Sequence, residues 1–302
     1  MNKLSDRFKE LSEGENFALG MLIAIQLING GTYLMVKVAL RTFDPFSLGC
    51  LRLALAGSVV AGVMWARGRL HSPRKGDRLK FLLLATLAVP LNQGLFLYGM
   101  KFCPAAHGAL LYAMTPTLVL LLSTLSGLES PNRYKIGGIF LSFTGVATVL
   151  FERGLAFSSE MLWGDGFLFA AVCTWALYTM ISKRMVARYS PFYLTGITLS
   201  IGALLYLPIG LPFLARLNWS ALDRSSFVSL FYLAFLTSVV TYFVFTWALS
   251  KLDASRVSIV ANLQPIVAAL LGWFFLGERV TLHFWFGAAL VAGGVLLAQR
   301  RS

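Results

Sequence analysis

Apolar stretches long enough to cross a lipid bilayer recur along the entire chain of 302 residues. A membrane-spanning helix needs about 20 predominantly apolar residues. Ten such stretches lie near residues 17–39, 46–66, 79–99, 105–126, 134–151, 163–182, 192–214, 226–248, 254–276 and 282–298. Charged residues make up only 13% of the chain, against roughly a quarter in soluble proteins. The sequence therefore predicts an all-α polytopic membrane protein with ten transmembrane helices and no soluble domain.

The positions of the basic residues account for a formal net charge of +13 without a nucleic-acid partner. Of the 26 Lys and Arg, Lys37 and Arg52 are assigned to the spans and to neither side. Six lie on one side of the membrane: Arg41, Lys101, Arg153, Arg216, Arg224 and Arg279. The other eighteen lie on the opposite side, at the termini, in the connections after spans 2, 4, 6 and 8, or in the first turn of the span that follows such a connection. Because Lys- and Arg-rich loops stay in the cytoplasm, we expect cytoplasmic terminal segments at residues 1–16 and 299–302.

The two halves of the chain resemble each other. At a constant offset of 149 positions, residues 96–150 match residues 245–299 at ten of 55 positions, among them Pro116/Pro265, Gly138/Gly287 and Gly145/Gly294. The chain thus divides into two repeats of five spans, residues 17–151 and 163–298. Because five is odd, the second repeat enters the membrane from the opposite side. Inverted repeats of this kind are typical of secondary transporters, whose solute site lies near the middle of the membrane between the repeats.

Further motifs recur in both halves. An aromatic residue ends the third span of each repeat, and a small-residue helix, a proline and a glutamate follow it. In the first repeat these residues are Tyr98, Pro116 and Glu129. In the second repeat they are Trp247, Pro265 and the glutamate of "LGER" at 276–279. The segments "LRLALAG" around Arg52 and "WALYTMISKR" in the sixth span complete the pattern. In this order, and over nearly the whole chain, the sequence resembles the EamA-type branch of the drug/metabolite transporter superfamily.

This resemblance implies a ten-helix transporter of the bacterial inner membrane that exports amino acids, other small metabolites, drugs or toxic cations. Such proteins have no ATP site, and no G-x-x-x-x-G-K-[ST] motif occurs in this sequence. Two positions depart from the pattern. Asn29-Gly30 replaces the usual Trp-Gly pair of the first span, and His107 is not a general feature of the family. We expect both to reflect the choice of substrate.

Polar side chains inside the spans predict the wall of a solute cavity, because polar groups in a bilayer need partners or water. The candidate amides are Gln26, Asn29, Asn92, Gln93, Asn262 and Gln264. The alternative is that these amides only bridge neighbouring helices. Pro116 and Pro265 predict helix kinks, because proline cannot bond the carbonyl four residues earlier, here that of Tyr112 or Ala261.

Aromatic residues with polar tips form a second set of candidates, because they suit an amphipathic solute. They are Tyr98, Tyr112, Trp175, Tyr178, Tyr242 and Trp247. Interfacial aromatic belts are the alternative explanation, above all for Tyr98 and Trp247.

Titratable groups are scarce within the spans. Arg52 either contacts a solute carboxylate or extends along its stem to the membrane surface. No Asp or Glu lies at the middle of a span, so His107 is the candidate for proton coupling, with a hydrogen-bonded residue at a helix end as the alternative. Uncoupled exchange also remains open.

These features predict a secondary transporter that exports or exchanges a small amphipathic metabolite, an amino acid above all, by alternating access. The alternatives are a multidrug or organic-cation exporter and a lipid-linked sugar flippase subunit. Three histidines, with no H-E-x-x-H motif and no mid-span carboxylate pair, argue against an intramembrane enzyme. We expect no metal or other cofactor and no nucleic acid. The expected partners are the solute and the lipid bilayer, and the small residues of the last span in each repeat favour a monomer over a weak homodimer.

Overall fold

The structure, a computed structural model, describes residues 2–127, 132–150, 159–252, 257, 260, 263–278 and 281–298. These residues are helical or lie in turns and bends, and no strand is present among them. The first repeat contains α1 (Asn2–Ala39), α2 (Pro45–Ala66), η1 (Lys75–Asp77), α3 (Arg78–Thr86), η2 (Leu87–Leu91), α4 (Asn92–Phe102), α5 (Ala105–Tyr112), α6 (Thr115–Leu125) and α7 (Arg133–Leu150). The second contains α8 (Ser159–Met185), α9 (Pro191–Leu214), η3 (Trp219–Ala221), α10 (Arg224–Phe231), η4 (Tyr232–Val240), α11 (Thr241–Lys251), α13 (Leu263–Leu276) and α14 (Leu282–Ala298).

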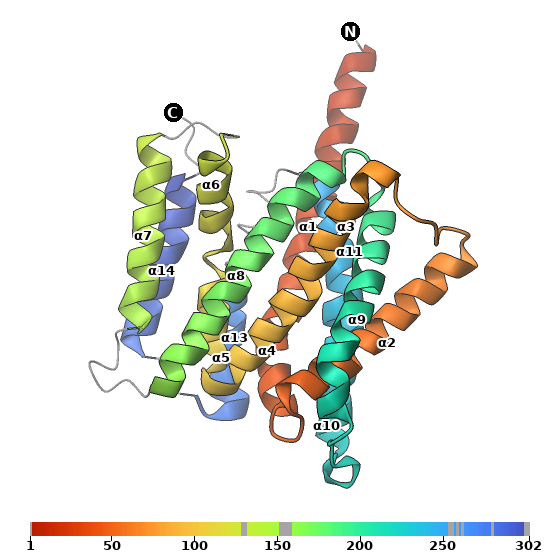
Figure 1. Cartoon of the computed structure of the whole chain (residues 1–302). Helices are drawn as coiled ribbons and strands as arrows, with labels where there is room; N and C mark the ends of the chain where they lie inside the picture. Colours follow the sequence, from red (N-terminus) through yellow and green to blue (C-terminus); the bar gives the residue numbers. More distant parts are fainter. Residues whose placement is uncertain are drawn as a thin grey trace.

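The described helices pass back and forth through one bundle, and this arrangement fits the all-α architecture of two five-helix repeats that the sequence predicts. Within the described residues, seven helical stretches are long and apolar enough to cross a membrane, and α13 and α14 are shorter apolar helices. The beginning of α1 and the end of α14 lie at the same end of the bundle (Figure 1), as an even number of passes requires. Helix α1 begins at Asn2 and extends beyond the other helices (Figure 1), so the segment before residue 17 continues the first span as a helix.

The third pass of each repeat is built in the same unusual way. It begins as an α-helix, widens into a π-helical segment, and continues as an α-helix: α3–η2–α4 in the first repeat and α10–η4–α11 in the second. A shift of 149 positions superimposes the bounds of α4 on those of α11. Pro90 lies within η2 and removes one backbone donor, whereas η4 contains no proline. Such π-helical segments are frequent at functional sites.

Contacts between equivalent positions locate the pseudo-two-fold axis that relates the repeats. Gln93 donates from Nε2 to the hydroxyl of Tyr242, exactly 149 positions later in the chain, at 3.1 Å. Ser142 of α7 donates to the backbone carbonyl of Val291 of α14, again 149 positions later, at 3.4 Å. A residue touches its own symmetry equivalent only at the axis. The axis therefore passes through the α4–α11 contact and through the α7–α14 pair.

Helices α7 and α14 pack side by side at one edge of the bundle (Figure 1). A Cβ atom added at Gly145 would lie 2.6 Å from the carbonyl oxygen of Gly287, and one added at Gly294 would lie 2.6 Å from that of Gly138. These two approaches are symmetry equivalents of each other. The small residues therefore serve packing within the monomer, where they let two backbones approach closely.

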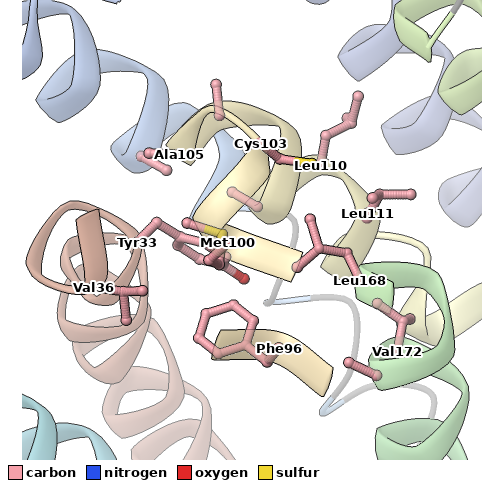
Figure 2. Packing of buried hydrophobic residues seen from close by; sticks show 14 of the residues in the cluster. Tyr33, Val36, Phe96, Met100, Cys103, Ala105, Leu110, Leu111, Leu168 and Val172 are labelled. Atoms are coloured by element: carbon pink, nitrogen blue, oxygen red, sulfur yellow. The ribbon is translucent and has the colours of Figure 1, made fainter. Parts of the chain in front are cut away.

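Two buried apolar clusters occupy the two ends of the bundle. One contains the end of α1, the end of α4 and the beginning of α5. Figure 2 shows part of it, with Tyr33, Phe96 and Met100 gathered between α1 and α4. The other cluster contains the beginning of α1, α3, the end of α8 and α11. The polar residues of the spans lie between the two clusters.

Candidate functional site

A cavity of about 90 Å³ lies between the two repeats. A single water molecule needs roughly 10–15 Å³ on this measure, so the cavity holds several waters or a polar part of a solute. Its lining residues come from α1, α2, α4, α5, α6, α8, η4, α11 and α13, together with Val257. Both repeats thus contribute to its wall. Nine predicted site residues line it: Gln26, Asn29, Arg52, Asn92, Gln93, Tyr112, Trp175, Tyr242 and Gln264.

One polar network joins α1 to α13. Gln264 donates from Nε2 to Oε1 of Gln26 at 2.6 Å, and its own Oε1 accepts from the hydroxyl of Tyr33 at 3.0 Å. Asn29 adds a longer bond to Oε1 of Gln26, at 3.3 Å. Gln26 and Gln264 are both buried. The amides therefore bridge two helices and line the cavity together, so the two explanations offered for them at the sequence level are compatible.

A second network joins the middle of the two repeats. Asn92 donates from Nδ2 to the hydroxyl of Tyr112 at 3.0 Å and to the carbonyl of Ala171 at 2.8 Å. Gln93 donates from Nε2 to Oδ1 of Asn92 at 3.0 Å as well as to Tyr242. The hydroxyl of Tyr242 in turn donates to the carbonyl of Ala88 in the π-helical segment η2, at 3.1 Å.

Arg52 faces the cavity and does not extend to the membrane surface. Its side chain is 1% exposed. Its Nε donates to the carbonyl of Leu233 at 3.1 Å and to the hydroxyl of Ser238 at 2.7 Å. Both acceptors belong to η4, the π-helical segment of the other repeat. The wide turn of η4 thus holds a guanidinium group at the junction of the repeats.

Two fully buried polar atoms of the lining residues have no hydrogen-bond partner within the described part of the protein. They are Nη1 of Arg52, which can only donate, and Oε1 of Gln93, which can only accept. Buried polar groups normally have partners. The described wall contains no Asp or Glu. Among the buried atoms of the lining residues, Arg52 therefore keeps one unused donor and Gln93 one unused acceptor.

The structure shows one of the two predicted kinks. Helix α5 ends at Tyr112, and Pro116 lies in the first turn of α6. The carbonyl of Tyr112 accepts instead from the hydroxyl of Thr115, at 2.6 Å. Pro265 lies near the beginning of α13, but Ala261 and the candidate Asn262 lie outside the described residues.

Three aromatic candidates lie away from the cavity. Tyr98 packs against Phe46, Phe102 and Phe167. Trp247 lies against Phe17 in an apolar groove at the other end of the bundle. Tyr178 is fully buried and does not line the cavity, but it stacks on Trp175, which does. The aromatic neighbours of Tyr98 and Trp247 fit packing or the membrane interface.

His107 also lies outside the cavity, beside a carboxylate that the sequence did not single out. Its Nδ1 lies 3.8 Å from Oδ1 of Asp165, in the second turn of α8, and both side chains are largely buried. Cys103 donates to the same oxygen from 3.2 Å. Nearby, Glu278 accepts from the backbone N–H of Ala105, the first residue of α5, at 2.9 Å. These groups lie toward the end of the bundle opposite to the termini.

Sequence reasoning missed eight lining residues: Thr32, Tyr33, Phe96, Thr115, Thr237, Thr241, Phe245 and Val257. Phe96 and Phe245 are identical residues at equivalent positions of the two repeats, so the internal alignment could have indicated them. The threonines could not have been chosen, because their hydroxyls commonly bond their own helix. Thr32 does so, yet it also bonds Thr237 across the repeat interface at 2.9 Å.

The sequence profile of the EamA-like transporter family matches residues 16–151 and, a second time, residues 162–299. The chain belongs to the EamA-like transporter family. It is therefore a multi-pass membrane transporter of the drug/metabolite transporter superfamily, and the double match agrees with the two repeats seen in the fold.

Related proteins share the length of this transporter. An uncharacterized transporter of Archaeoglobus fulgidus is 28% identical over 283 residues, which cover 93% of this chain and 96% of the relative. The uncharacterized transporter YyaM of Bacillus subtilis is 26% identical and covers 92% of each chain. The uncharacterized inner membrane transporter YicL of Salmonella typhimurium is 26% identical over 83% of each chain. A solved crystal structure with 19% identity has a similar fold, with a TM-score of 0.68 over 93% of this chain and 97% of that one.

Proposed function

We propose that the protein is a secondary transporter that exports or exchanges a small amphipathic metabolite, an amino acid above all, by alternating access. The observation that carries this proposal is the cavity between the inverted repeats, with an unused donor on Arg52 and an unused acceptor on Gln93. A solute with a carboxylate and an amino group carries the complementary pair. Inverted repeats supply the two states, because each half can adopt the conformation of the other.

The aromatic part of the wall suits the apolar portion of such a solute. The ring of Trp175 lies edge-on to that of Tyr242 at a centroid distance of 5.3 Å, and Phe245 lies 5.2 Å from Trp175. Phe96 belongs to the first repeat and lines the part of the wall that this repeat supplies. These rings offer apolar surface, and their faces attract an ammonium group.

Transport of organic cations has less support. A cavity for cations favours a carboxylate in its wall, and the described wall contains Arg52 and no acid. A lipid-linked sugar flippase would need a lateral opening large enough for a lipid head group. The described polar cavity opens between helices that both repeats supply, and it fits a small solute better.

Counterflow in proteoliposomes tests the proposal. Liposomes containing the protein are preloaded with an unlabelled amino acid, and uptake of its labelled form is measured for a panel of amino acids, with and without a pH gradient. We expect accumulation of at least one member, and dependence on the gradient would indicate proton coupling. Uptake of a cationic dye with no uptake of any amino acid would overturn the amino-acid assignment.

We further propose that the protein lies in the bacterial inner membrane with both termini in the cytoplasm. The excess of Lys and Arg in the connections at the terminal end of the bundle supports this orientation. Single cysteines placed at Gly76, between α2 and α3, and at Ser220, between α9 and α10, test it in a background without Cys50, Cys103 and Cys173. In whole cells, an impermeant maleimide should label the cysteine at 220 and not the one at 76. The reverse pattern, or labelling of both, would refute this orientation.

A further inference from the structure

The guanidinium of Arg52 is a fixed positive charge at the junction of the repeats. Arginine remains protonated in proteins, and this side chain is 1% exposed. Its Nε donates two hydrogen bonds to neutral oxygens of η4. These bonds hold the guanidinium of a residue that lines the cavity, and its buried Nη1 has no partner among the described residues.

No described residue of the cavity wall balances this charge. The wall consists of amides, hydroxyls, aromatic rings and an aliphatic side chain. The three phenols of the described wall are all engaged. Tyr112 accepts from Asn92, Tyr242 donates to the carbonyl of Ala88, and Tyr33 donates to Gln264. A buried charge without a partner is costly, and a guanidinium binds carboxylates with paired, directional hydrogen bonds.

Gln93 supplies the complementary position in the same cavity. Its Nε2 is occupied by Asn92 and Tyr242, which orients the amide and directs Oε1 away from these partners. That oxygen is buried and unpartnered. It accepts a hydrogen bond from an N–H group, and the neighbouring rings of Trp175 and Tyr242 would stabilise a positive charge on that group.

We infer that the cavity is selective for solutes with a carboxylate, which pairs with Arg52, and that Gln93 accepts a hydrogen bond from a second, N–H-bearing group of the same solute. This inference rests on the proposed transport function and names its substrate class. Arg52 is the one charged residue in the described wall, and its positive charge disfavours organic cations. A carboxylate without an amino group binds, but more weakly than the amino acid.

Four small probes test this selectivity without knowledge of the physiological solute. The purified protein in lipid nanodiscs is heated with L-leucine, with 4-methylpentanoate, which lacks the amino group, with L-leucinamide, which lacks the carboxylate, or with tetraethylammonium. Sodium chloride at equal ionic strength serves as the blank. We expect a rise in Tm with L-leucine, a smaller rise with 4-methylpentanoate, and none with the two cations.

Substitutions assign the selectivity to residues. Arg52→Gln should weaken the apparent affinity for both carboxylates by about tenfold or more, as expected for the loss of one charge-assisted hydrogen bond. Arg52→Lys should restore part of it, because the charge is kept while the bonds from Nε are lost. Arg41→Gln is the matched control, because it removes an exposed arginine outside the cavity and should change nothing.

Gln93→Ala keeps the test decisive if the Arg52→Gln variant does not fold. In this variant L-leucine should lose its advantage over 4-methylpentanoate, while 4-methylpentanoate still raises Tm. Equal or greater protection of the wild-type protein by the cations, or no protection by either carboxylate up to the solubility limit, would overturn the inference. Undiminished carboxylate protection of Arg52→Gln would do the same.

Counterflow separates this inference from the function on which it rests. A protein that exchanges leucinamide or tetraethylammonium across liposomes, and not carboxylates, is still a transporter, but its selectivity is not the one inferred. A protein that binds the carboxylates through Arg52 and exchanges none of them has the inferred site without the proposed function.

Discussion

Gly145→Val should strongly destabilise the protein, because the new side chain would collide with the backbone of the neighbouring helix. A Cβ atom at this position lies 2.6 Å from the carbonyl oxygen of Gly287 and 2.9 Å from Cβ of Leu290. Neither the backbone atom nor the Cβ atom can rotate away, so α7 and α14 must separate. Overpacking of this kind costs about 1–3 kcal/mol, and more where the backbone must move. The measurement is the Tm and the monodisperse yield of the detergent-solubilised variant.

Gly137→Val is the matched control on the same helix. A Cβ atom there has one neighbour within 4 Å, Cδ2 of Leu297 at 3.5 Å, which is ordinary van der Waals contact. Both variants carry the same change in helix propensity, so their difference isolates the close approach at Gly145. Equal Tm values for the two variants would show that α7 and α14 do not pack in this register.

Exchange of solute should be much faster than its net efflux, because an empty cavity leaves Arg52 without a counter-charge when both ends of the bundle are closed. An unpaired buried charge costs about 3–5 kcal/mol. Since each 1.4 kcal/mol changes a rate by a factor of about ten, return of the empty carrier should be slower by roughly 100-fold to several thousand-fold. The loaded carrier avoids this cost because the solute carboxylate pairs with the guanidinium.

Proteoliposomes loaded with a labelled amino acid that gives counterflow provide the measurement. Its efflux is followed into buffer with and without the unlabelled compound outside. In Arg52→Gln the ratio of the two rates should fall toward one, because the empty cavity no longer carries a charge. A ratio near one in the wild-type protein would argue against this account of the empty state.

The sequence predicted the architecture well, because the features that determine it are periodic or duplicated. Span length, the match between halves and the glycines of α7 and α14 are all visible as letters, and the family profile agrees with the repeats. Pro116 predicted the break between α5 and α6 because its chemistry alone removes a helical hydrogen bond.

The site was predicted less completely, because it depends on which way each side chain points. The sequence left Arg52 between the cavity and the membrane surface. The choice is made by η4, whose oxygens at Leu233 and Ser238 accept from Arg52, and no proline or glycine in residues 232–240 indicates a π-helix. Asp165 was overlooked because it lies near the start of a span, and only the fold brings it beside His107.

The bond between Gln93 and Tyr242 has a consequence for the conformational change that we propose. When the two repeats exchange conformations, a contact between two positions is replaced by a contact between the equivalent positions of the other repeat. Positions 93 and 242 are equivalent to each other, so the contact between them is the same contact in both conformations. The same holds for positions 142 and 291. In the alternating access that we propose, these two contacts are therefore expected to persist while the other helices rotate about them. The bonds of Arg52 to η4 would instead break and re-form in each transport cycle.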